Sequence, residues 1–281
     1  YSLQDVKISL ERINEIHQMD DENGKEGLKT SIENKDEGID IKNIMFKYDP
    51  HTLHKTIDDV NIHIPQGKVT AIVGASGSGK TTLIRLMLGY YPVLEGQIYI
   101  GNTDINTLNK KWWRRQCGVV MQDGIIFSES IARNIAVDDG DIDKERLLKA
   151  AEIACIKDYV MALPLKFNTK IGRDGVGLSQ GQKQRILIAR AVYKNPDYIF
   201  LDEATNSLDA NNERSIVENL DKFYKGKTVV IVAHRLSTVK NADQIVVIDH
   251  GKVVEVGNHE SLTAKRGTYY NLVKNQLELG N

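Results

Sequence analysis

The sequence lacks several features that would each point to a particular class of protein. Its two cysteines, Cys117 and Cys155, form no CxxC pair, so we expect two reduced, buried thiols and neither a disulfide nor a zinc site. No run approaches the roughly 18 apolar residues of a membrane span, and the polar N-terminus does not resemble a signal peptide. The 37 basic and 38 acidic residues leave a net charge of −1, which gives no attraction to nucleic acid. We therefore expect a soluble, intracellular chain without a nucleic-acid partner.

The 281 residues are enough to bury a sizeable core. Leu3, Val6, Leu10 and Ile13 recur at helical spacing, which predicts an apolar helical face within residues 1–19. This helix either packs on its own domain or ends a longer helix, and periodicity does not separate the two. Residues 20–38 are charged and contain glycine, which predicts a linker.

Beyond the linker, the pattern changes from alternating to continuously apolar segments. Residues 39–48 and 60–65 alternate, which suits antiparallel strands. Residues 68–74, 198–204 and 227–234 are continuously apolar and alternate with helical stretches, which predicts a mainly parallel α/β sheet. Residues 244–257 predict a hairpin that turns at His250-Gly251. Between about 123 and 194 strand signals are absent and residues 143–160 and 182–194 are helical, which predicts an inserted helical subdomain.

Residues 74–81, GASGSGKT, fit the GxxxxGK[ST] pattern between a strand and a helix. The glycines let backbone N–H groups converge on an oxyanion, and the helix N-terminus adds partial positive charge. Lys80 would bridge the β- and γ-phosphates, and the Thr81 hydroxyl would ligate Mg²⁺. The residues that we expect to hold the nucleotide here are Gly74, Ser76, Gly77, Ser78, Gly79, Lys80, Thr81 and Thr82.

Other chemistry-bearing side chains follow three further predicted strands. Asp202 and Glu203 end YIFLDE, where Asp202 fits the Mg²⁺ shell and Glu203 fits a general base for the attacking water. His234 ends TVVIVAH and would contact the γ-phosphate. Gln122 ends VVMQ and could meet both the metal and the water.

Taken together and in this order, these residues resemble the nucleotide-binding domain of an ABC transporter, over roughly residues 39–275. The resemblance implies a P-loop NTPase fold: a RecA-like mixed-sheet core, an antiparallel β subdomain and the helical insertion, which together fill residues 39–281. It also implies an adenine-stacking role for Tyr48, a signature motif at 178–182 and a D-loop at 206–209 that ends in Asp209. ATP and Mg²⁺ are the implied cofactors.

In that family two domains pack head to tail, and each ATP lies between one P-loop and the other subunit's signature helix. The resemblance therefore implies a homodimer with ATP, in which Ser179, Gly181 and Gln182 bind the partner's nucleotide. Ser179 and the backbone N–H near Gly181 would contact its γ-phosphate, since a helix N-terminus suits an anion. Hydrolysis would release the pair, so the domain would act as a switch.

The chain is most similar to exporters, in particular bacterial peptide or bacteriocin exporters, some of which carry an N-terminal peptidase domain. Residues 1–19 resemble the segment after the last membrane helix, and residues 169–175 resemble the loop that touches the membrane domain. These similarities imply a transmembrane partner within a longer chain and a place at the cytoplasmic face of the bacterial inner membrane. Gln180 and Arg173 depart from the family, which usually has glycine and often glutamate there. A soluble non-transport ATPase and a non-catalytic half of an asymmetric pair are the alternatives.

Overall fold

A six-stranded sheet organises the computed structural model, which describes residues 3–18, 22, 27–137, 140–204, 210–233 and 236–279. The strand order is β10-β9-β3-β8-β7-β6, and all neighbours pair in parallel except β10, which is antiparallel to β9. The strands are β3 (Val69–Val73), β6 (Cys117–Val120), β7 (Tyr198–Asp202), β8 (Thr228–Val232), β9 (Gln244–Asp249) and β10 (Lys252–Gly257).

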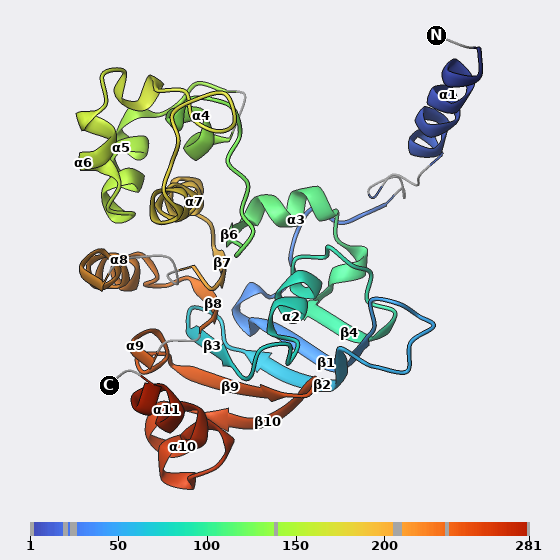
Figure 1. Ribbon diagram of the computed structural model, residues 1–281. Helices are drawn as coiled ribbons and strands as arrows, with labels where there is room; N and C mark the ends of the chain where they lie inside the picture. Colours follow the sequence, from blue (N-terminus) through green and yellow to red (C-terminus); the bar gives the residue numbers. More distant parts are fainter. Residues whose placement is uncertain are drawn as a thin grey trace.

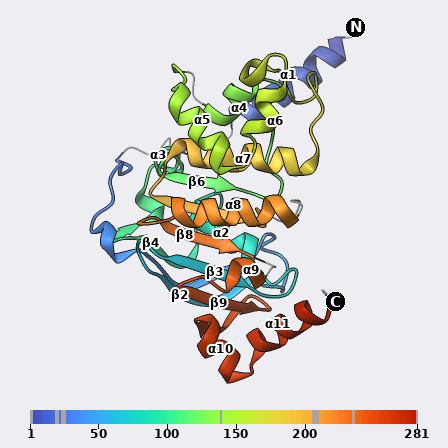
Figure 2. The same ribbon diagram turned by 90° about the vertical axis from the view of Figure 1, so that its left-hand side faces the viewer.

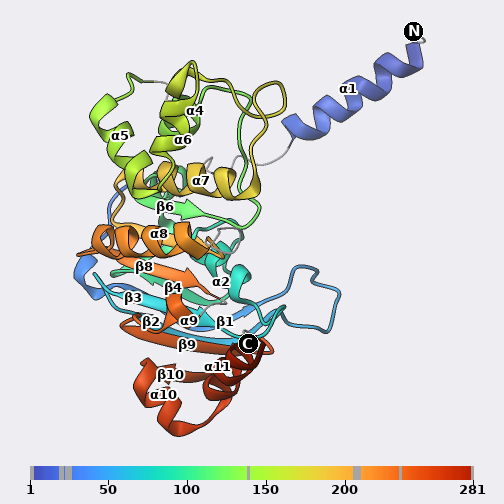
Figure 3. The same ribbon diagram turned by 60° about the vertical axis from the view of Figure 1, so that its left-hand side comes forward.

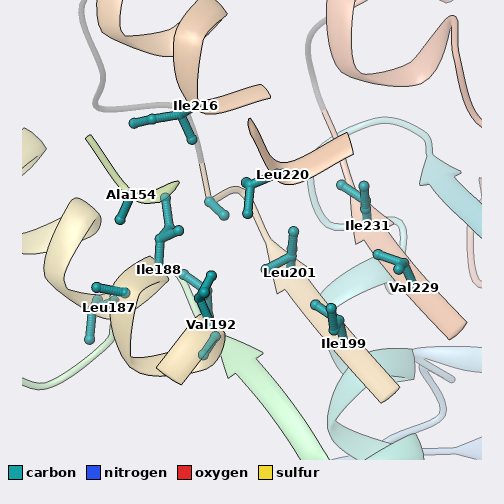
Figure 4. Packing of buried hydrophobic residues seen from close by; sticks show 14 of the residues in the cluster. Ala154, Leu187, Ile188, Val192, Ile199, Leu201, Ile216, Leu220, Val229 and Ile231 are labelled. Carbon is teal, nitrogen blue, oxygen red and sulfur yellow. The ribbon is translucent and has the colours of Figure 1, made fainter. Parts of the chain in front are cut away.

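The central strands are continuously apolar because both faces of this sheet are covered. Successive side chains point to opposite faces, so Ile199 and Leu201 of β7 join one core cluster while Phe200 between them joins the other. The first cluster lies under α7 (Gln180–Lys194) and α8 (Ala210–Phe223). Figure 4 shows Ile188 and Leu220 of these helices facing Leu201 and Ile231 of the strands.

The opposite face carries α2 (Lys80–Met87) and a second sheet of order β2-β1-β4-β5. Its pairs are antiparallel, as their alternating sequences predict. The strands are β1 (Ile39–Phe46), β2 (Ile57–Ile64), β4 (Glu95–Ile100) and β5 (Thr103–Asp104), followed by η2 (Ile105–Thr107) and α3 (Lys110–Gln116). Trp113 of α3 is fully buried, and its indole N–H donates to the carbonyl oxygen of Met87, which ties α3 to the end of α2.

The helical subdomain lies at one end of the molecule, beyond β6 (Figure 2). It consists of α4 (Ile131–Ala136), α5 (Lys144–Ile153), α6 (Lys157–Ala162), η3 (Lys166–Asn168) and α7. The stretch expected to be helical over 143–160 forms two helices, α5 and α6, and the chain breaks between them where Cys155 adopts φ +51°. Both cysteines are free, but only Cys117 is fully buried and Cys155 at this break is half-buried.

The N-terminal region has two parts of different character. Residues 27–38, which include η1 (Lys35–Glu37), follow the second sheet: the Lys29 N–H donates to Thr107, and the Asn102 N–H donates to Glu33. In contrast, α1 (Leu3–His17) stands apart from the rest of the chain (Figure 1, Figure 3), and every side chain of residues 4–17 is exposed. The domain boundaries at 19 and 38 stay predictions.

The expected architecture of a mixed-sheet core, an antiparallel subdomain and a helical insertion is confirmed. After β8 the chain forms α9 (Leu236–Val239), and after β10 it forms α10 (His259–Lys265) and α11 (Thr268–Leu279) at the end of the molecule opposite the helical subdomain (Figure 2). Within the described ranges, none of the helices is both long and apolar enough to cross a membrane.

The two-sided burial of β7 predicts a large cost for shortening one of its side chains. Ile199→Ala should lower the free energy of unfolding by roughly 2–4 kcal/mol, because a cavity forms between β7 and the overlying helices. The control is Val254→Ala on β10, whose side chain is 45% exposed and should cost less than about 1 kcal/mol. Urea unfolding followed by circular dichroism measures both, and equal losses would contradict the layered packing.

Candidate functional site

The site is built where the carboxyl ends of the parallel strands meet. Ile72 of β3 and Asp202 of β7 both pair with Val232 of β8, so the three strands end side by side. The loop after β3 therefore begins at the level of Asp202. In an open α/β sheet this edge is where ligands bind.

Residues 74–79 form a tight loop between β3 and α2. Gly74 adopts φ +154°, and a Cβ there would overlap the carbonyl oxygen of Ile248. The loop thus passes so close to β9 that only glycine fits. Gly79, with φ +106°, precedes the first residue of α2, so Lys80 and Thr81 occupy the helix N-terminus.

The hairpin between β9 and β10 braces this loop. The N–H of Gly251 donates to the carbonyl oxygen of Ser78 at 3.1 Å, and its own carbonyl accepts from the N–H of Asp58 on β2. The sequence predicted the turn at His250-Gly251 but not this contact. A turn motif indicates local geometry, and its neighbour is decided by the sheet order.

The Lys80 side chain is buried at the centre of the loop. Its ammonium donates to the carbonyl oxygens of Gly74 and Ala75 at 3.0 and 2.7 Å. Burial lowers the pKa of Lys80, while the nearby carboxylates of Glu203 and Asp202 oppose that shift. The P-loop cation and the two acids therefore share one electrostatic environment, although β8 lies between β3 and β7 in the sheet.

Asp202 is fully buried, and neither of its carboxylate oxygens has a hydrogen bond of full geometry among the described residues. Burial raises the pKa of Asp202, opposed by the Thr81 hydroxyl and reinforced by the Glu203 carboxylate. A buried carboxylate with open lone pairs beside a hydroxyl fits Mg²⁺, which is held by one or two carboxylates together with substrate phosphates. Within the described residues no cluster of three His, Cys, Asp or Glu forms a metal centre by itself.

Glu203 follows β7 in a left-handed conformation, with φ +53°. A non-glycine residue there costs of order 1–3 kcal/mol and persists only when its surroundings hold it. The Glu203 N–H donates to the carbonyl oxygen of Val232, and its own carbonyl accepts from the side-chain amide of Gln184 on α7. Gln184 was not predicted from the sequence. The available signal was its position four residues before Ile188, which places a polar residue on the apolar face of a helix.

Gln122 and Tyr48 flank this centre. Val120 of β6 pairs with Leu201, and Gln122 comes two residues later, in the turn that follows β6. The Tyr48 hydroxyl lies 2.9 Å from the Thr82 hydroxyl on α2, and Tyr48 as a residue is 48% exposed. Both predicted residues thus lie beside the loop and strand ends, and their roles stay predictions.

The signature residues lie elsewhere, at the N-terminus of α7 in the helical subdomain. Ser179 caps the helix by accepting from the Gln182 N–H, while the Gln182 side chain accepts from the Ser179 N–H. Ser179 is exposed, and its hydroxyl proton stays available for a ligand. In the sheet, β8 and β7 separate β3 from β6, against which α7 packs. The predicted residues therefore form two groups. His234 and Asp209 lie outside the described residues.

Comparison with known proteins identifies a family and related transport proteins. Residues 57–206 match the family model described as ABC transporter. The chain is 43% identical over 278 residues to the toxin RTX-III translocation ATP-binding protein of Actinobacillus pleuropneumoniae, covering 98% of this chain and 38% of that protein. It is 44% identical over 241 residues to the leukotoxin translocation ATP-binding protein LktB of Mannheimia haemolytica, covering 86% of this chain and 34% of that protein.

A solved structure, that of a bacterial Atm1-family ABC exporter with ATP bound, superposes with a TM-score of 0.90 at 30% identity. The match covers 98% of this chain and 48% of that chain. The chain thus spans just over a third of the length of the two curated relatives and about half of this structure.

The buried carboxylate predicts a measurable cost to stability without metal. Because its pKa is raised, the ionised form of Asp202 is disfavoured in the folded state, and it destabilises the protein at neutral pH. Asp202→Asn should therefore raise the free energy of unfolding without nucleotide or Mg²⁺ by roughly 1–2 kcal/mol.

The control is Asp197→Asn, a half-exposed carboxylate in a surface ion pair with Lys35, which should change stability by less than about 0.5 kcal/mol. Urea titration in EDTA measures both variants. Destabilisation by Asp202→Asn would mean that the carboxylate is already satisfied by protein groups.

Proposed function

Because the chain belongs to the ABC transporter family, we propose that it is the ATP-binding and ATP-hydrolysing motor domain of an exporter. The observation that carries ATP hydrolysis is the juxtaposition of a P-loop lysine with a buried carboxylate and a second acid at the end of β7, which β8 separates from β3 in the sheet. These are the parts that phosphoryl transfer needs: a phosphate cradle, a metal ligand and a group for the attacking water.

Each of these residues has a role that follows from its position. The loop N–H groups and the Lys80 ammonium bind the β- and γ-phosphates at the N-terminus of α2. Thr81 and Asp202 hold Mg²⁺, which neutralises charge on the phosphates when bound, and Gln122 is a further candidate ligand. Glu203 accepts a proton from the water molecule while the oxygen of that water attacks the γ-phosphorus. The bond between the γ-phosphorus and the β-phosphate oxygen breaks, and ADP leaves with the electron pair.

The separation of Ser179 from the P-loop supports a shared site. The exposed N-terminus of α7 presents a hydroxyl and helix N–H groups, yet it lies in a different subdomain from Lys80. Two copies packed head to tail would bring Ser179, Gly181 and Gln182 of one copy to the nucleotide of the other. ATP then joins the two copies, and its hydrolysis releases them. By the family resemblance, Asp209 and His234 complete this site.

A second exposed surface supports a membrane-domain partner. The segment after Gln122 and the loop 169–176 lie side by side, since the Arg173 N–H donates to the Ser128 hydroxyl and the Ile171 N–H donates to the Glu129 carbonyl. They expose Ile125 and Val176, which are 67% and 44% accessible. Apolar side chains exposed beside the nucleotide edge suit docking of cytoplasmic helices from a membrane domain.

The N-terminal helix supports the same arrangement. Val6, Leu10 and Ile13 lie on one face of α1, and each is at least half exposed. A helix packed on its own domain would bury this face, so we propose that α1 is the end of a connecting helix from the membrane domain. The whole transporter then places this domain at the cytoplasmic face of the bacterial inner membrane.

The transported molecule is proposed from the relatives alone. Their names specify toxin and leukotoxin translocation, so we propose a polypeptide substrate, and a bacteriocin is one member of that class.

Reading the coding region upstream of Tyr1 tests the proposal that this domain belongs to a transporter. About six membrane spans would support it, whereas none would favour a soluble non-transport ATPase.

We expect Glu203→Gln to abolish turnover and to trap an ATP-bound dimer, because the amide cannot accept the proton while the phosphate contacts remain. Gel filtration with Mg²⁺-ATP at high protein concentration measures the dimer, and a phosphate-release assay measures turnover. The matched control adds Ser179→Ala to the same variant and should return the protein to the monomer. A Glu203→Gln protein that stays monomeric would contradict the shared site.

Gln180 offers a second test, because it is exposed at the first position of α7 where the family usually has glycine. Gln180→Gly should leave the ATPase rate within a few-fold of the parent, since Ser179 and the N–H of Gly181 are kept. Ser179→Ala is the comparison and should reduce the rate far more. A loss with Gln180→Gly as large as with Ser179→Ala would assign the Gln180 side chain a direct role.

A further inference from the structure

Gln184 is a buried polar side chain within the apolar face of α7. It is only 8% exposed, and the residues that follow it on this face, Ile188 and Ala191, belong to the core. Its amide nitrogen donates to the carbonyl oxygen of Glu203 at 2.9 Å. A buried amide costs free energy unless it is hydrogen-bonded. The Gln184 side chain is therefore favoured in the position from which it reaches the Glu203 carbonyl oxygen.

The acceptor of this bond belongs to a residue in a left-handed backbone conformation. Glu203 holds φ +53° directly after β7, and two hydrogen bonds fix the peptide groups on either side of it. Its N–H is held by Val232 of β8 and its carbonyl by Gln184 of α7. The sheet alone therefore fixes one side of Glu203, and α7 fixes the other.

The same helix is capped by Ser179, five residues before Gln184. A rise of 1.5 Å per residue separates the two positions by about 7.5 Å along the helix axis. Ser179 is exposed at the end of α7, while Gln184 faces the interior. Because α7 is one continuous helix over Gln180–Lys194, a displacement of its N-terminus also moves the amide that holds Glu203.

We propose that Gln184 is a positioning residue that holds Glu203 for hydrolysis and couples the two ATP sites of the dimer. This inference rests on the proposed function. In a head-to-tail pair, Ser179 of one copy contacts the ATP held by the other copy's P-loop, while Glu203 of the first copy serves its own. Helix α7 thus touches one ATP through Ser179 and reaches the glutamate of the second site through Gln184.

The test replaces Gln184 with methionine, which has a similar length and shape but no N–H donor. Gln184→Met should lower kcat for Mg²⁺-ATP hydrolysis about tenfold, because a misplaced catalytic group costs rate without weakening substrate binding. The half-saturating ATP concentration should stay within twofold. The matched control is Gln244→Met at the start of β9. It removes the hydrogen bond that the Gln244 amide donates to the carbonyl oxygen of His63. The control should keep the parent's kcat.

A second measurement separates positioning from support of the fold. In the Glu203→Gln background, adding Gln184→Met should leave the ATP-dependent dimer on gel filtration, because the phosphate contacts do not depend on this bond. Loss of that dimer together with turnover would overturn the proposal and make Gln184 a purely structural residue. A parent-like kcat in Gln184→Met would overturn it too.

Coupling has its own readout, the Hill coefficient of hydrolysis against ATP at protein concentrations that saturate the dimer. We expect a value above one in the parent and close to one in Gln184→Met. A parent value of one, or an unchanged value in the variant, would overturn the coupling. A parent without Mg²⁺-dependent hydrolysis would instead refute the proposed function, so the two failures are distinguishable.

Discussion

The parallel pairing of β3, β8 and β7 is the constraint on which the site depends. It ends three strands at one level, so that the phosphate loop, Asp202 and Glu203 face the same region although well over a hundred residues separate the loop from the acids. The apolar faces on both sides of the sheet hold this alignment. Because the strand ends are fixed by many buried side chains, Asp202 stays buried there without a hydrogen bond of full geometry to its carboxylate among the described residues.

Helix α7 serves the core and the site together. Its apolar face packs on β7, its N-terminus presents Ser179 outward, and Gln184 holds the residue after β7. Because α7 is one continuous helix, a shift at its N-terminus also moves its core contacts and the Gln184 amide. In the proposed head-to-tail dimer, closure of α7 on one nucleotide would therefore reach the glutamate that acts on the other.

Much of this arrangement follows from local patterns. The glycine spacing and the strand-helix junction that identify the P-loop are local, although the need for glycine at Gly74 comes from the carbonyl oxygen of Ile248 on β9. Continuous apolar runs predicted the parallel strands. The acidic residues Asp202 and Glu203 were identified because they directly end one of these runs. The break at Cys155, where φ is +51°, was missed because helical periodicity continues through it.

The sequence by itself determined the phosphate loop, the acids at the end of β7, the helical insertion and the apolar face of α1. Each of these features is a pattern of residues that are close together in the sequence. Only the tertiary structure decided which distant groups meet: Gly251 with the phosphate loop, Gln184 with Glu203, and the segment after Gln122 with the loop 169–176. Hydrogen bonds between residues far apart in sequence leave no periodicity, since they depend on the order of strands in the sheet and on how the helices lie across it.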